Sequence, residues 1–462
     1  MKRRVFGIET EYGLTAATLD GTPASLNADE AARELFTPLI QQYRSTNLFL
    51  RNGGRLYLDV GSHPEYATAE CDRLDDLLAQ DRAGSRLFTD LAAQADRRLE
   101  EHGRPERMYL FRNNVDSQGN SYGCHENYLL HRRRDFRQVA DALVAFFITR
   151  QALVGSGYIR RTPAGAVYCT SQRAEHMWDA VSSATTRSRP IINTRDEPLA
   201  DSTSYRRMHV IVGDTNVCEA TTALKIGATQ LILDAIEEGI HLEDLALADP
   251  MGAIRQLNTG NNTQVRLDLA DGRSMTAAQI QREIYERVLR RCPAEEMTSL
   301  LVYVVDLWDR AIHALDTNDW TQVDTELDHV IKKKLIDAYM SRTGCRLSDP
   351  RIARLDLSYH DITASGLADR MEKTGLMKRL STDEEVASAT RTPPLTTRAY
   401  LRGKIIGAAQ DAHVDLAADW VHIRPEYGNA QPLSLQDPFA CEDVRVDALI
   451  RDITDSTPVL PA

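Results

Sequence analysis

Acidic residues gather near the start of the chain, in a segment whose alternation predicts a strand. Between Arg3 and Gly13, Glu9 and Glu11 fall on one face, because successive side chains of a strand point to opposite faces. Apolar and aromatic residues occupy the other face. Two adjacent carboxylates suit a divalent cation, although solvated glutamates are also ordinary on the open face of a sheet.

A second predicted strand, 54–61, carries three groups suited to chemistry in one row: Arg55, Tyr57 and Asp59. An arginine can bind a phosphate with two parallel hydrogen bonds from its planar guanidinium group. The tyrosine adds an oxygen contact, and the aspartate can accept a proton or bind a metal ion. The alternative is a surface ion pair between Arg55 and Asp59, which would contribute little to stability.

More carboxylates and a hydroxyl follow in the segment 62–70. A Mg2+ ion bound to phosphate takes only a few hard oxygen ligands from the protein, and Glu9 and Glu65 could supply them. Glu70 has two interpretations, since an acidic side chain also suits the first turn of the helix that follows.

Two later predicted strands carry histidines beside other polar groups. His125 and Asn127 share a face within 122–130, and Arg207 and His209 share a face within 206–212. A cationic pair could hold a transferred phosphate, and phosphoryl transfer needs both Mg2+-binding carboxylates and arginines. The alternatives are a structural histidine, since no second histidine at ligand spacing accompanies His125, and a basic edge strand that resists aggregation.

The elements that position these residues predict an α+β fold. Strands and helices do not alternate regularly, and short polar turns such as 116–120 join strands, so the sheet should be largely antiparallel. Strands are expected at 5–13, 55–60, 108–115, 122–131 and 207–212. Helices are expected at 74–103, 136–155, 217–239, 280–288, 295–314, 320–341 and 363–374.

Composition narrows the functional class. The net charge of -12 argues against non-specific binding to nucleic acid or anionic membranes. Seven scattered cysteines without zinc spacing favour reduced thiols in the cytoplasm, and no signal peptide or membrane span is expected. The sequence has no phosphate-loop, nucleophile-elbow or Rossmann motif. A proline-containing stretch, 385–397, is typical of a linker or a crossover and would divide units at 1–390 and 391–462.

Three motifs carry a resemblance to a known family: GIETEYG at 7–13, NGGRLYLD at 52–59 and HPEYATAEC at 63–71. They resemble the ligases of prokaryotic ubiquitin-like protein (Pup), which are carboxylate–amine ligases related to glutamine synthetase. The likeness continues through GCHEN at 123–127, the strand 206–214 and the region around Trp420. It implies a glutamine synthetase-like curved antiparallel sheet that cradles ATP, with a small C-terminal domain.

The resemblance also implies individual roles. Asp59 would be the catalytic base. The Mg2+ ligands would be Glu9, Tyr57 and Glu65, and the contacts to ATP would come from Arg55, Thr68 and Trp420. To these the strand faces add Glu11 as a further metal ligand, and Arg207 and His209 as further contacts to the nucleotide.

The expected reaction is ATP-dependent and joins two proteins. The γ-phosphate would pass to the C-terminal glutamate of Pup, and a lysine of a target protein would attack the activated carboxyl to form an isopeptide bond that marks the target for proteasomal degradation. Both partners need activation, because a carboxylate is a poor electrophile and lysine is mostly protonated at neutral pH. Pup resembles an acidic, disordered chain, so the resemblance also implies a locally basic groove.

Two other functions stay open from the sequence. The sibling depupylase uses a similar site to hydrolyse the bond, and fold alone does not separate the two activities. The Ile-Glu-Thr-Glu of the first strand and the short stretch between Gly13 and Asn52 favour the ligase. A non-catalytic nucleotide-binding scaffold is the third possibility, and the presence of Asp59 argues against it.

Overall fold

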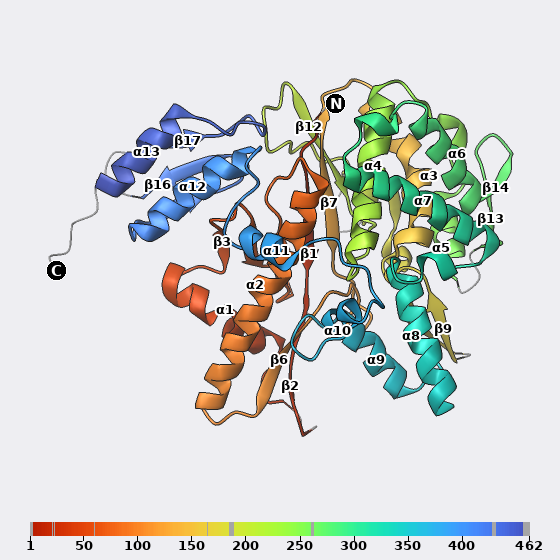
Figure 1. The fold of residues 1–462 in the computed structure, drawn as a ribbon, viewed down its shortest axis with the longest axis horizontal. Coiled ribbons are helices and arrows are strands. Elements are labelled where there is room, and N and C mark those ends of the chain that lie inside the picture. Colours follow the sequence, from red (N-terminus) through yellow and green to blue (C-terminus); the bar gives the residue numbers. More distant parts are fainter. Residues whose placement is uncertain are drawn as a thin grey trace.

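The computed structural model describes residues 3–455 apart from 21, 23, 60, 164, 184–188, 260–262 and 427–430. Its centre is a sheet of eight strands, counted over these residues (Figure 1). In spatial order the strands are β10 (Asp179–Ser182), β11 (Pro190–Asn193), β12 (Tyr205–Val210), β7 (Cys124–His131), β1 (Phe6–Glu11), β5 (Pro64–Ala67), β4 (Arg55–Leu58) and β3 (Asn47–Phe49). Only β10 and β11 pair in parallel, so the predicted α+β class and largely antiparallel sheet are confirmed.

One face of this sheet is apolar and the other is polar. Along β1 the burial alternates residue by residue: Phe6 and Ile8 are buried, whereas Glu9 and Glu11 are half-buried on the opposite face. β1 pairs with β5 on one side and β7 on the other. The carboxylates of β1 therefore lie in the middle of the polar face, with side chains from both neighbours around them.

Helices cover the apolar face. They are α2 (Leu74–Glu101), α3 (Phe136–Val154) and α4 (Glu219–Glu237) (Figure 1). α3 and α4 are buried along almost their whole length, as expected of helices that are hydrophobic on all sides. Behind them pack α5 (Pro250–Leu257), α6 (Ala277–Leu289) and α7 (Ser299–Thr317). This two-layer core holds the sheet rigid from behind and leaves the polar face free.

Further elements surround this core. The other helices before the C-terminal unit are α1 (Ala28–Tyr43), α8 (Asp328–Thr343), α9 (Pro350–His360), α10 (Ala368–Lys373) and α11 (Asp383–Ala389). Three separate two-stranded sheets pair β2 (Gly13–Thr18) with β6 (Glu106–Phe111), β8 (Tyr158–Thr162) with β9 (Gly165–Cys169), and β13 (Arg266–Asp268) with β14 (Ser274–Thr276).

The C-terminal unit has a hydrophobic cluster of its own. It contains α12 (Arg398–Asp411), the small sheet of β15 (Leu416–Ala418), β16 (His422–Pro425) and β17 (Leu433–Ser434), and α13 (Val444–Asp455). Leu401, Ile405, Ile423 and Leu449 pack together inside it. The unit lies against the β3 end of the main sheet, where the rings of Phe49 and Trp420 meet edge to face with centroids 5.0 Å apart.

Most of the predicted helices are present, with shifted ends. The helix predicted at 320–341 begins only at Asp328, and the one predicted at 363–374 corresponds to α10. Six helices were absent from the prediction: α1, α5, α9, α11, α12 and α13. The sequence does carry a signal for α1: Asn27 and Glu30 form a reciprocal capping box, a spacing that marks helix starts.

Two expectations about connections were met only in part. The turn 116–120 closes a single antiparallel bridge between Val115 and Ser121, but the strands on either side do not pair with each other, because β6 pairs with β2 while β7 pairs with β1 and β12. The stretch 385–397 is not a free linker: its first part belongs to α11, which packs on α2, and the buried Thr397 hydroxyl donates to the Glu70 carbonyl at 2.7 Å. Val60, predicted to face the core, lies outside the described residues.

Within the described residues, no helix combines the length and the apolar character that crossing a bilayer requires.

Candidate active site on the polar face of the sheet

Strand pairing brings the sequence-predicted residues into two adjacent rows. Glu65 lies opposite Tyr57 on one side and opposite Glu11 on the other. In the next row, Ala67 lies between Arg55 and Glu9, and Glu9 lies opposite His125. Because paired residues share a face, residues far apart in the sequence converge over β4, β5, β1 and β7, as the faces of the predicted strands required.

Three carboxylates form the more acidic row. Ligand oxygens of Glu11, Asp59 and Glu65 all lie within 4.8 Å of one another. Glu65 is buried, whereas Asp59 is exposed where β4 ends. Burial, together with the negative charges of Glu9 and Glu11, raises the pKa of Glu65 well above its usual value. A cation would relieve this repulsion, and oxygen ligands of this kind suit Mg2+.

The second group pairs Glu9 with two histidines. His125 Nδ1 lies 3.4 Å from one Glu9 oxygen, and the His125 and His209 ring centroids are 5.0 Å apart. Burial opposes the charge of Glu9, but the hydrogen bond from His125 and the nearby His209 and Arg207 outweigh it and hold the pKa of Glu9 well below its usual value. Burial lowers the pKa of His209 to about 3, so this imidazole is neutral and able to bind a metal ion.

Arg207 closes the β12 side of the site. Its Nη1 donates to Asn127 Oδ1 at 2.8 Å, and Asn127 Nδ2 donates to Glu9 at 3.1 Å. Arg207 also lies 3.9 Å from Glu9 and 3.6 Å from Glu197. The guanidinium is thus fixed beside the carboxylate rows, where it can meet a negatively charged ligand.

Arg55 and Tyr57 form the β4 side. Arg55 stacks 4.1 Å above the Tyr57 ring and donates to Asn47 Oδ1 at 2.8 Å. The surface ion pair between Arg55 and Asp59 does not form, although the structure describes both residues. Burial and the charges of Glu9 and Glu65 raise the pKa of Tyr57, so its hydroxyl keeps its proton.

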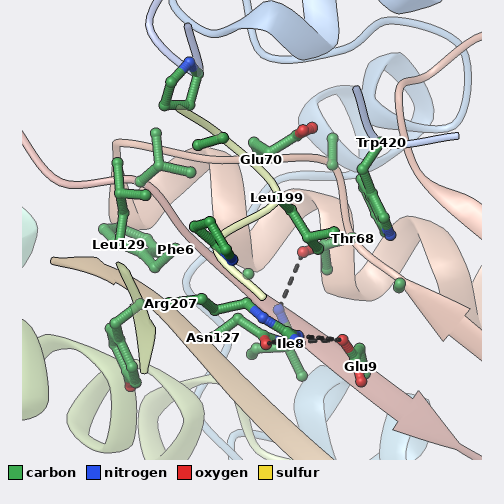
Figure 2. Close-up of a pocket in the computed structure, with 18 of the residues that line it drawn as sticks. Phe6, Ile8, Glu9, Thr68, Glu70, Asn127, Leu129, Leu199, Arg207 and Trp420 are labelled. Carbon is green, nitrogen blue, oxygen red and sulfur yellow. Dashed lines mark hydrogen bonds and ion pairs between the residues drawn. The ribbon is translucent and has the colours of Figure 1, made fainter. Parts of the chain in front are cut away.

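A cavity next to these rows has a mainly apolar lining (Figure 2). Its floor is made of small residues, including Gly7 and Ala69, and Leu199 and Trp420 form walls. The Thr68 hydroxyl accepts a hydrogen bond from the Ile8 amide at 3.1 Å, and a Cβ on residue 7 would lie 3.1 Å from that oxygen. Glu9 and Arg207 line the same cavity, so a flat apolar group bound here could extend toward the carboxylate rows.

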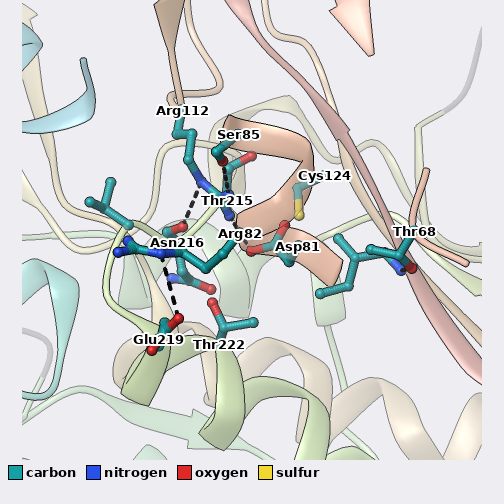
Figure 3. Close-up of polar contacts among 12 residues, drawn as sticks. Thr68, Asp81, Arg82, Ser85, Arg112, Cys124, Thr215, Asn216, Glu219 and Thr222 are labelled. Atoms are coloured by element: carbon teal, nitrogen blue, oxygen red, sulfur yellow. Dashed lines mark hydrogen bonds and ion pairs between the residues drawn. The ribbon is translucent and has the colours of Figure 1, made fainter. Parts of the chain in front are cut away.

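A buried polar network supports β1 from behind (Figure 3). Arg112 donates to Asp81 at 2.7 Å, to the Ser85 hydroxyl at 2.8 Å and to the Asn216 carbonyl at 3.0 Å. The Tyr12 hydroxyl lies 3.1 Å from Ser85 Oγ. Since Tyr12 directly follows Glu11, this network fixes the end of the strand that carries the carboxylates.

Sequence reasoning placed most of these residues correctly on one face. It missed the contact of His125 with His209, because the two histidines lie on different strands and only the β7–β12 register brings them together. Trp420 is half-buried at the cavity wall and not in a core. Glu70 neither begins α2, which starts at Leu74, nor joins the carboxylate rows; it pairs with Arg398 and Arg402.

Comparison with known proteins identifies the family. The family model for Pup-ligase proteins matches residues 4–424. This chain belongs to the Pup-ligase family. It is 52% identical to the Pup–protein ligase of Xylanimonas cellulosilytica over 459 residues, covering 98% of this chain and 100% of that protein. It is 51% identical to the Pup–protein ligase of Mycolicibacterium smegmatis, covering 97% and 99% of the two chains.

Solved structures of the family agree in fold. The crystal structure of the complex between Pup and its ligase PafA matches with a TM-score of 0.92 and 43% identity, over 99% of this chain and 92% of that one. The structure of the Pup ligase PafA in complex with ADP matches with a TM-score of 0.85 and 45% identity, over 94% and 96% of the two chains. The Pup-ligase fold therefore extends over essentially all of this chain.

Proposed function

We propose that this chain is an ATP-dependent ligase that joins the C-terminal glutamate of Pup to lysines of target proteins. Its membership of the Pup-ligase family supports this activity. The observation that carries the chemistry is that Glu9 and Arg207 line the apolar cavity, directly beside the row of carboxylates that contains Glu65. Acidic oxygens for a metal ion next to an arginine are the groups that phosphoryl transfer requires.

Mg2+ fits the acidic row by the chemistry of its donors. The oxygen ligands Glu11 and Glu65 lie together, and burial and the negative charges of Glu9 and Glu11 raise the pKa of Glu65. We assign Glu9, Glu11, Tyr57 and Glu65 as the residues that hold the ion. When bound, Mg2+ would neutralise phosphate charge.

The apolar cavity fits the base of the nucleotide. Trp420 offers a ring face or edge, Thr68 a hydroxyl, and the small floor residues allow close approach to the backbone. Arg55, Arg207 and His209 then flank the position of the phosphates. These cationic and polar side chains would orient the γ-phosphate toward the glutamate carboxylate of Pup.

Asp59 has the position required of a base. It is exposed at the end of β4 and lies beside Glu11 and Glu65. A lysine entering from solvent therefore meets Asp59 before it reaches the buried carboxylates. Asp59 would take the proton of the incoming amine, which is mostly protonated at neutral pH.

The decisive assay incubates the purified chain with ATP, Mg2+, Pup ending in glutamate and a lysine-bearing protein. We expect a conjugate whose mass is the sum of the two proteins minus one water. Formation of no conjugate, with cleavage of preformed conjugates instead, would establish the hydrolase alternative. Binding of ATP without either reaction would establish a scaffold.

We further propose two domains, 1–390 and 391–462, and action in the cytoplasm. The separate hydrophobic cluster of Leu401, Ile405 and Ile423 supports the boundary. The seven cysteines are free thiols, as suits a reducing compartment. Limited proteolysis near residue 390 and fractionation of cells that express the chain test these two points.

A further inference from the structure

A buried ion cluster joins the main sheet to the C-terminal unit. Glu70 follows β5, and Arg398 and Arg402 come from α12. Arg398 Nε lies 2.9 Å and Arg402 Nη1 lies 3.0 Å from Glu70 Oε1, and Arg402 Nη2 donates to the second oxygen. All three residues are buried. Both arginines hold the pKa of Glu70 at about 2 despite its burial.

The Nη groups of the two arginines also reach four backbone carbonyls. Arg398 donates to the carbonyls of Leu199 and Leu435, and Arg402 to those of Gly53 and Trp420. These carbonyls come from three distant parts of the chain: the segment before β4, the segment around Leu199 and the C-terminal unit. Leu199 and Trp420 both line the apolar cavity, as do Glu70 and Arg398 themselves, and the Gly53 segment leads into Arg55.

The aromatic wall rests on the same cluster. The Arg402 guanidinium lies 5.0 Å from the Trp420 ring centroid and 5.5 Å from that of Phe49. Leu199 adopts a left-handed backbone with φ of 51°, which a branched residue rarely takes unless its surroundings hold it. The hydrogen bond from Arg398 to the Leu199 carbonyl holds the backbone in this conformation.

A buried cluster of this type is a poor source of net stability, because desolvating the ions offsets much of their attraction. Its clearest physical effect is geometric: each arginine is locked in one orientation by Glu70 and locks two carbonyls in turn. We propose that Glu70 is a positioning residue for the nucleotide pocket, which acts through Arg398 and Arg402 to fix the Leu199 and Trp420 walls and so sets the affinity for the base. The inference rests on the proposed nucleotide-binding function.

The test compares two ligands that share phosphates and differ in the base: ATP and inorganic tripolyphosphate, each with Mg2+. Affinities are measured by calorimetry on the full chain and on Glu70→Gln. We expect Glu70→Gln to weaken ATP binding about tenfold or more, as losing one base–aromatic contact does, and to leave tripolyphosphate within about twofold. The conjugation rate at saturating ATP should fall less than the affinity.

The matched control is Glu326→Gln. Glu326 also makes an ion pair, with Arg310 at 2.6 Å, and accepts from Tyr303, but it lies on the α7–α8 side away from the cavity. Glu326→Gln should lower the thermal stability without changing the affinity for ATP or for tripolyphosphate. Equal loss of ATP and tripolyphosphate binding in Glu70→Gln, or no loss of ATP binding, would overturn the inference.

If Glu70→Gln does not fold, Arg402→Lys gives the same test, because it keeps the charge but cannot reach all of its present partners. Loss of ATP affinity without loss of tripolyphosphate affinity is again expected, and unchanged affinities for both ligands would refute the role. An unmutated chain that binds neither ligand would refute the proposed function itself, which is a separate outcome.

Discussion

Glu65 and Glu70 lie five positions apart, on β5 and just beyond it, and their surroundings are opposite. Around Glu65 the nearest charged groups are the carboxylates of Glu9, Glu11 and Asp59, which together with burial raise its pKa. Around Glu70 they are two arginines, which lower its pKa to about 2.

The difference separates two uses of a buried acid. When the charged neighbours of a buried carboxylate are all negative, a bound cation is the simplest way to balance their charge. A carboxylate held by two arginines is complete within the chain and serves to hold other groups in place. The carboxylates on the polar face of the sheet can thus bind a cation, whereas Glu70, just beyond β5, contributes to the shape of the neighbouring cavity.

The largest effect is expected from Asp59→Asn, which keeps the shape of the reactive end of β4 and removes the base. Conjugation should slow by about 10²–10⁴-fold, measured as conjugate formed per minute by mass spectrometry. ATP affinity should stay close to that of the unmutated chain. Asp337→Asn, an exposed acid on α8 that pairs with Lys333, is the control, and an equal loss of rate there would contradict the assignment.

Glu65→Gln should weaken the binding of the metal ion. Removing one ligand of the ion should lower the conjugation rate by about 10–100-fold at limiting Mg2+, a range measured for groups around metal sites. Excess Mg2+ should recover part of the rate. Without metal, the thermal midpoint of Glu65→Gln should equal or exceed that of the unmutated chain, because a repelled, buried carboxylate is removed. A large fall in the midpoint would show that Glu65 is structural.

Glu70→Gln should destabilise the folded chain, whereas Glu65→Gln should not. The size of this loss should depend on pH. The pKa of Glu70 is lowered from 4.5 to about 2, so its charge stabilises the folded chain above pH 4.5. A shift of this size corresponds to about 3 kcal/mol. This contribution is lost as the pH falls from about 5 to 2.

Urea unfolding at pH 7 and at pH 3.5 checks this prediction. Glu70→Gln should lower the free energy of unfolding more at pH 7 than at pH 3.5. Equal losses at both pH values would mean that lost packing, and not the charge of Glu70, explains the effect.

The smallest effect is expected from Trp420→Ala. Losing an aromatic contact to the base should weaken ATP binding about tenfold, with little change in the rate at saturating ATP. Trp178→Ala is the control, because Trp178 is 61% exposed and does not line the cavity. Equal effects of the two changes in a calorimetric titration would remove Trp420 from the proposed nucleotide pocket.

The alternation of side chains along a strand makes it predictable which site residues of the same strand share a face. The period of two places Glu9 with Glu11, and Arg55 with Tyr57, on single faces from the sequence alone, because these relations lie within one strand. The same logic predicts the shared face of Arg207 and His209.

Relations between strands and helices could not be predicted in this way. His125 meets His209 only through the register of β7 with β12. Glu70 meets its arginines across more than 320 residues, and periodicity within a segment says nothing about such partners. The helix α1 is different: its capping box is visible in the sequence, and a closer search for helix starts would have found it.

Trp420 lies near the C-terminal end of the chain, so it is synthesised late. The strands that carry Glu9, Arg55 and Glu65 leave the ribosome early, whereas Trp420 and Leu435 follow only after nearly all of the sheet and its helices. A nascent chain would therefore carry its acidic rows long before it could enclose a nucleotide base. Catalytic competence would arrive late in translation, once α12 has docked onto Glu70.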